Sequence, residues 1–83
     1  MTTTMYSVYA GHYHSPAIAK GDVLKINKLG LQGFVFSRGD HYALKVYASP
    51  DENKVDIIKK ALEANGFNVE IETVDLSKNL HTS

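Results

Sequence analysis

The sequence predicts an α+β fold in which four antiparallel strands form one sheet and two helices cover one face of it. The sequence contains an internal repeat with an offset of 36 positions. Tyr6 and Tyr42 begin similar alternating segments, and Gly30 and Gly66 follow similar helical segments. Each copy reads as a strand, a helix and a strand that follows a glycine, which is typical of two βαβ units. With 83 residues, the chain has room for a single domain.

Helix-capping residues locate the two helices. Ser15 can cap a helix N-terminus, and Pro16 suits the first helical position, where its missing N–H costs nothing. Ser49 and Pro50 repeat this pair, so we expect a cap at Ser49 and a second helix from Pro50. Gly21 lies inside the first predicted helix, where we interpret it as a point of close packing against the sheet.

Alternation of apolar and polar residues locates the strands. Arg38-Gly39-Asp40 predicts a tight turn between the middle two strands, with the glycine at positive φ. Right-handed crossovers then give the order β-α-β-β-α-β, a ferredoxin-like or RNP-like sandwich with one bare sheet face. The expected elements are strands over 5–11, 31–37, 41–48 and 67–73 and helices over 16–29 and 50–65. The inward positions expected to be buried include Val8, Ile26, Leu44 and Leu62.

We expect one domain over 5–74, with disordered residues 1–4 before it and a flexible tail over 75–83.

Composition excludes several function classes. The formal charge is +0, from nine basic and nine acidic residues, which argues against a strong non-specific binder of nucleic acid or membrane surfaces. The absence of cysteine excludes a disulfide framework and a thiol nucleophile. No apolar run reaches the roughly 20 residues of a membrane span. No signal peptide is evident, so a complete chain is expected to be cytoplasmic.

The bare sheet face carries more aromatic residues than a solvent-facing sheet side normally does. Three uses compete: a platform on which rings stack against sugars or bases, a homodimer or partner interface, and scattered aromatics without a partner. The candidate ligand-binding residues on this face are Ser7, Tyr9, Phe34, Phe36, Lys45 and Tyr47, with His12 at a strand end.

Other combinations of residues are weaker signals. His12 and His14 lie two positions apart but lack a cysteine or carboxylate in motif spacing, so we interpret them as solvated loop histidines. We therefore expect no metal site and no cofactor. No nucleophile, base and orienting group occur together, so the sequence does not predict an enzyme.

The repeated motifs resemble those of SPOR (sporulation-related repeat) domains over about residues 6–74. The similar features are the Tyr-x-(Val/Leu)-x-(Ala/Val) strands, the Ser-Pro helix starts, and the Gly-Leu and Gly-Phe pairs that follow the helices. The resemblance implies a bacterial or phage module that binds peptidoglycan glycan strands, favours strands stripped of stem peptides, and often marks cell-division sites. It also implies binding through the open sheet face, with ligand positions at Tyr9, His12 and Lys45 and with Phe34 and Phe36 beside them.

The sequence departs from the family pattern on that same face. Tyr9 stands where the family usually has Gln, His12 where it has Ser, and Tyr47 where it has Gly. One alternative is an RNA-binding module of RRM-like topology, although the face offers only one clear cation, Lys45, for phosphate. Another is a homodimerising domain that hides the aromatic face. The resemblance places an exported protein at the cell wall or septum.

Overall fold

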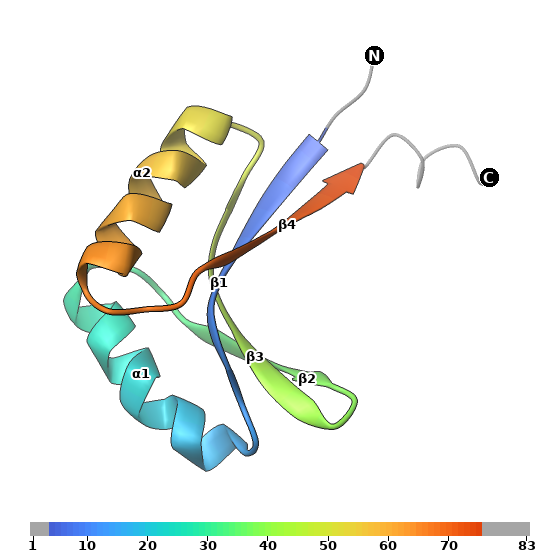
Figure 1. The fold of residues 1–83 in the computed structure, drawn as a ribbon, viewed down its shortest axis with the longest axis vertical. Coiled ribbons are helices and arrows are strands. Elements are labelled where there is room, and N and C mark those ends of the chain that lie inside the picture. The colour runs from blue at the N-terminus through green and yellow to red at the C-terminus, as the bar shows by residue number, and fades with distance from the viewer. Residues whose placement is uncertain (1–3, 76–83) are drawn as a thin grey trace.

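The computed structural model describes residues 4–75. Its sheet order is β2-β3-β1-β4, and every neighbouring pair of strands is antiparallel. Both helices cover the same face of this sheet, as Figure 1 shows, so the predicted α+β fold is confirmed. No helix within residues 4–75 is long and apolar enough to cross a membrane. The elements are β1 (Thr4–Tyr13), α1 (Pro16–Lys28), β2 (Phe34–Arg38), β3 (His41–Ser49), α2 (Glu52–Ala64) and β4 (Glu70–Asp75).

The outermost described residues lie in the two strands β1 and β4. Thr4 pairs with Asp75, because the ladder between β1 and β4 continues to the first and last described residues. These two residues therefore belong to strands. The rest of the predicted loose segments, residues 1–3 and 76–83, lies outside the described residues.

The first turn of each helix tests the capping predictions. Ser15 caps α1 as predicted, and its hydroxyl accepts from the Ile18 N–H at 3.4 Å. The predicted cap at Ser49 is wrong: Asp51 caps α2, and its carboxylate accepts from the Asn53 N–H at 3.0 Å. A carboxylate at this position also interacts favourably with the helix dipole. Ser49 stays in β3 and accepts a hydrogen bond from the Asp51 N–H.

Both helices end in the same hydrogen-bonded motif. The Leu31 N–H donates to the Ile26 carbonyl at 3.2 Å, and the Phe67 N–H donates to the Leu62 carbonyl at 3.1 Å. A glycine with a φ of 85° or 87° precedes each donor, which makes these ends Schellman motifs. The amides that follow the glycines thus belong to the helix ends. As a result, β2 and β4 begin three residues later than predicted.

The buried core consists of side chains that lie 36 positions apart. The two helices also have the same length, 13 residues, and begin 36 positions apart. The four residues that we expected to be buried all have no exposed surface. The related pairs, all buried, are Val8 and Leu44, Ala10 and Val46, Ala19 and Val55, and Ile26 and Leu62.

The glycine that packs closely is not the one predicted. A Cβ added at Gly21 would meet nothing within 4 Å, so close packing of α1 on the sheet does not explain this residue. At Gly33, by contrast, a Cβ would lie 3.0 Å from a methyl group of Leu44. The predicted turn is confirmed at Gly39, which has a φ of 70°.

Two bulges interrupt the ladder between the central strands. The register skips Ala10 in β1 and Val46 in β3, so Tyr9 pairs with Lys45 while Val8 pairs with Tyr47. Bulges bend a strand and increase its twist. In Figure 1, the tip of the β2–β3 hairpin and the end of β4 diverge from the middle of the sheet. The two bulges therefore bend the open face of the sheet.

Candidate functional site

The predicted binding face contains both accessible and covered residues. Phe34 and Phe36 have 53% and 45% of their surface exposed, respectively. Tyr9 and Ser7 are only 7% and 4% exposed, although they were predicted to stand uncovered on the same face. That part of the prediction is wrong, because both side chains are buried within the domain.

Arg38 and Glu72, one from each edge strand, meet over the Tyr9 ring; we call this group the bridge. One guanidinium nitrogen of Arg38 donates to the Tyr9 hydroxyl at 2.6 Å, and the guanidinium carbon lies 4.9 Å from the ring centroid. The Tyr9 hydroxyl donates to Glu72 at 3.2 Å, and two guanidinium nitrogens of Arg38 reach the Glu72 carboxylate at 3.4 Å. Arg38 lies on β2 and Glu72 on β4, so the bridge passes over both central strands.

The bridge is charged and open to solvent. The hydrogen bond from Arg38 lowers the pKa of Glu72, and the same hydrogen bond raises the pKa of Arg38. Both groups therefore stay ionised at neutral pH. Their side chains are 39% and 46% exposed, so solvent and salt weaken the attraction between them. From the sequence, Arg38 was predicted only as part of a turn. The available signal was its position four residues after Phe34, on the same side of the strand.

An open cleft of about 610 Å³ lies on the accessible half of the face. It is located beside the end of β3, where the segment before β2 does not pair with β3. We call it the aromatic cleft. Its volume falls within the range of small-molecule sites. Three aromatic rings, one ammonium group and a stretch of strand backbone contribute to it. The lining residues are Gly30, Leu31, Gln32, Phe34, Phe36, Lys45, Val46, Tyr47 and Ala48.

Lys45 provides a cation in the aromatic cleft. Its ammonium nitrogen lies 5.9 Å from the centroid of the Phe36 ring. Its charge also acts, after the hydrogen bonds from Arg38 and Tyr9, to lower the pKa of the Glu72 carboxyl. Tyr47 was predicted on the open face, and that prediction is wrong. The bulge at Val46 pairs Tyr47 with buried Val8, so its half-buried ring packs against the core while it lines the cleft. This combination suits a ligand that has apolar faces and carries hydroxyl, amide or acidic groups.

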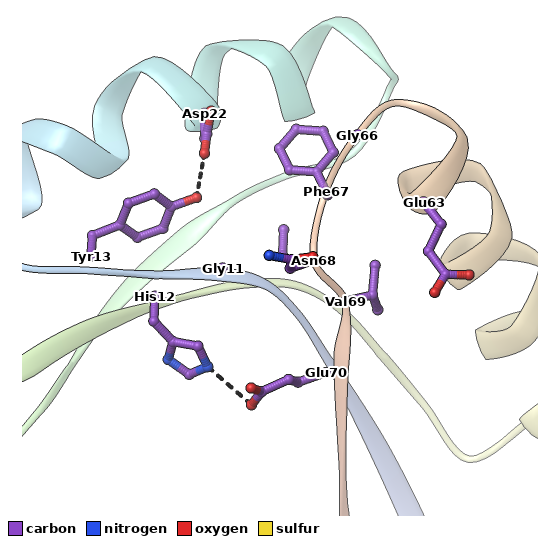
Figure 2. A pocket seen from close by; sticks show the side chains of 11 residues that line it. Gly11, His12, Tyr13, Asp22, Glu63, Gly66, Phe67, Asn68, Val69 and Glu70 are labelled. Atoms are coloured by element: carbon purple, nitrogen blue, oxygen red, sulfur yellow. Dashed lines mark hydrogen bonds and ion pairs between the residues drawn. The ribbon is translucent and has the colours of Figure 1, made fainter.

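A second cleft, of about 630 Å³, occupies the related position in the other half of the domain. We call it the polar cleft; Figure 2 shows it from close by. It lies between the end of β1 and the segment that leads into β4. Its walls, residues 10–12 and 66–70, are 36 positions from residues 46–48 and 30–34, which form the aromatic cleft.

Polar side chains in the polar cleft bond to one another. The Tyr13 hydroxyl donates to Asp22 at 2.5 Å, and His12 pairs with Glu70 at 2.9 Å. Figure 2 places these two pairs on opposite sides of β1. Burial, followed by the hydrogen bond to Asp22, raises the pKa of Tyr13, so its hydroxyl remains a donor. These pairings leave fewer polar groups for a ligand.

The two clefts differ in the side chains that line them. Phe34 corresponds to Glu70 and Tyr47 corresponds to Gly11, so the polar cleft has a carboxylate and a glycine where the aromatic cleft has rings. The buried pairs remain apolar in both halves because both pack against the same core. The aromatic cleft is therefore the better candidate for a ligand site.

His12 lies beside the bridge and outside the aromatic cleft. It belongs to β1 and pairs with Glu70, so the interpretation of a solvated loop histidine is wrong. Its ring also contacts that of His41, with the centroids 5.1 Å apart. In the described part of the chain, no group of three or more histidine or carboxylate side chains could hold a metal ion.

Comparison with known proteins identifies a related fold. No family model and no curated protein matches the sequence. The structure is similar to the solution structure of the peptidoglycan binding domain of CwlC, a cell wall lytic enzyme of B. subtilis, with a TM-score of 0.76. The match covers 86% of this chain and 90% of that chain at 17% sequence identity. This similarity confirms the SPOR-like fold that the sequence motifs predicted.

Proposed function

We propose that this chain is a non-enzymatic module that binds peptidoglycan glycan strands in the aromatic cleft. The observation that carries the proposal is that Phe34, Phe36 and Tyr47 line one cleft with Lys45, whose ammonium group lies over the Phe36 ring. Pyranose rings have apolar faces that can stack on aromatic rings, and their hydroxyl and acidic groups can bond a cation. The fold shared with a peptidoglycan binding domain supports the choice of ligand.

The proposal assigns different roles to the predicted site residues. The four residues of the aromatic cleft named above contact the glycan. Tyr9 and Ser7 are buried, so they support the floor of the face instead of touching the ligand. His12 lies at the margin and reaches the ligand only if the glycan extends toward β4. We expect a preference for strands without stem peptides, because a branching peptide would hinder contact between sugar rings and the cleft.

A sedimentation assay with purified peptidoglycan tests the proposal. We expect the protein to cosediment with peptidoglycan, and to do so more strongly after an amidase has removed the stem peptides. The double change Phe34→Ala and Phe36→Ala should abolish cosedimentation and leave the circular dichroism spectrum unchanged, since both rings are accessible. Leu24→Ala is the matched control, because Leu24 is 60% exposed but lies on α1. Equal binding by the double variant and the wild type would contradict the proposal.

Salt dependence and the oligomeric state separate this function from the two alternatives. RNA binding would weaken steeply with added salt, because phosphate contacts release counterions, whereas stacking on sugars should be much less sensitive. The ion pair between Arg38 and Glu72 also reduces the positive charge that the face offers to RNA. If the face instead joined two copies, the wild type would sediment as a dimer and the double variant as a monomer.

A further inference from the structure

The end of β3 presents a free backbone edge to the aromatic cleft. Pairing between β2 and β3 begins at Phe34 and Lys45, whereas β3 continues to Ser49 in its ladder with β1. Alternate residues of a strand direct their N–H and C=O groups to opposite sides. Residues 46–48 therefore leave backbone hydrogen-bonding groups on the side of the cleft. The Leu31 N–H, on the opposite wall, is bonded to the end of α1 and does not pair with this edge.

We propose that this free edge recognises the N-acetyl groups of the bound sugars, an inference that rests on the proposed function. An acetamido group resembles one peptide unit, with an N–H and a C=O that point in opposite directions. Placed in the cleft, it can bond to β3 on one side and to the segment 30–32 on the other. It would thus take the position of a peptide unit in a missing strand, in the manner of strand addition.

The opposite wall has the chemistry that this arrangement requires. Gln32 is exposed and lines the cleft, and its side-chain amide can both donate and accept. The rings of Phe34 and Tyr47 line the same cleft as this edge, so they can contact the apolar face of the sugar whose acetamido group bonds there. A site that hydrogen-bonds a substrate group discriminates against analogues without that group, because its own polar groups then lose their partner.

The polar cleft provides an internal comparison. β1 has an equivalent edge at residues 10–12, since its pairing with β4 stops at Tyr9 and Glu70. That edge faces Asn68, at the position related to Gln32, but the rings are absent: Glu70 and Gly11 replace Phe34 and Tyr47. We therefore expect N-acetyl recognition at the end of β3 and not at the end of β1.

Titration with defined oligosaccharides, followed by amide NMR spectra, tests this inference. The ligands are the tetramer of N-acetylglucosamine, its de-N-acetylated form, and cellotetraose, which is neutral and carries a hydroxyl in place of the acetamido group. We expect the N-acetylated tetramer to shift the amide signals of residues 46–48. We expect both other tetramers to bind at least about tenfold more weakly. Gln32→Ala should weaken binding of the N-acetylated tetramer, whereas Asn68→Ala should leave it unchanged.

The outcomes distinguish this inference from the proposed function. Equal affinity for the N-acetylated tetramer and cellotetraose would overturn N-acetyl recognition but would leave glycan binding in place. Shifts confined to residues 10–12 would also overturn it, because they would place the contact in the polar cleft. If amidase-stripped glycan strands failed to bind as well, the proposed function itself would fall.

Discussion

Shortening Leu62 to alanine tests the packing of α2 against the sheet. Leu62 has no exposed surface and belongs to the core cluster, together with Leu44 of β3 and Val8 of β1. It also lies 36 positions from Ile26, which occupies the related place in α1. Leu62→Ala removes three carbon atoms from the centre of the domain, where no solvent can fill the space.

The expected loss is large for a domain of this size. Three carbons at ~0.8 kcal/mol each give a transfer cost of about 2.4 kcal/mol, to which the remaining cavity adds. We expect Leu62→Ala to lower the free energy of unfolding by about 2–5 kcal/mol. A loss of ~3 kcal/mol would lower the Tm by roughly 12–24 °C. It would also remove a substantial share of the ~4–12 kcal/mol that a chain of 83 residues normally has.

Urea denaturation followed by far-ultraviolet circular dichroism measures this loss. Leu24→Ala is the matched control, since it makes the same chemical change at a position of α1 that is 60% exposed. We expect the control to change stability by less than about 0.5 kcal/mol. If Leu62→Ala cost no more than the control, the assignment of Leu62 to the core would be refuted.

Three further predictions concern stability and titration. Gly21→Ala should raise the free energy of unfolding by about 0.5–1 kcal/mol, because α1 has open space there and alanine favours helix, and thermal melts would measure the gain. Glu72 should titrate below its ordinary pKa of 4.5 in carboxyl NMR spectra and return toward it in Arg38→Gln. Its contribution to stability is present above pH 4.5 and is lost as the pH falls through the folded-state pKa. The raised pKa of Tyr13 implies that stability falls as the pH rises above 10.0, and Tyr13→Phe should remove this part of the alkaline decline in urea titrations.

Residues that lie 36 positions apart have similar side chains in the core but different side chains on the surface. Inside, the pairs such as Ile26 and Leu62 are all apolar, because each half must bury one helix against the same sheet. Outside, Phe34 and Glu70 occupy related positions with opposite chemistry. Packing limits the inward side chains in both halves, whereas the outward side chains are free to differ. This difference is the physical reason for proposing a ligand at only one of the two clefts.

Local signals in the sequence were sufficient to predict the fold class. Helix caps, glycines after helices and alternating strands depend on residues only a few positions apart, so Ser15 and Gly39 could be interpreted without the tertiary structure. The same local patterns predicted that Val8 and Leu44 face the helices. They also predicted the outward side for Phe34 and Phe36, but not for Tyr47, because the bulge at Val46 shifts the alternation there.

The tertiary structure decided which outward residues remain accessible. Tyr9 is covered because Arg38, 29 positions away, and Glu72, 63 positions away, meet over its ring. No pattern of neighbouring residues predicts such a contact, since it depends on how the bulged central strands bend the sheet. The aromatic cleft has the same origin: β2 starts to pair only at Phe34, so the end of β3 lacks a neighbour on that side. The sequence by itself therefore determined which residues could form a binding face, and the folded chain decided which of them a ligand can reach.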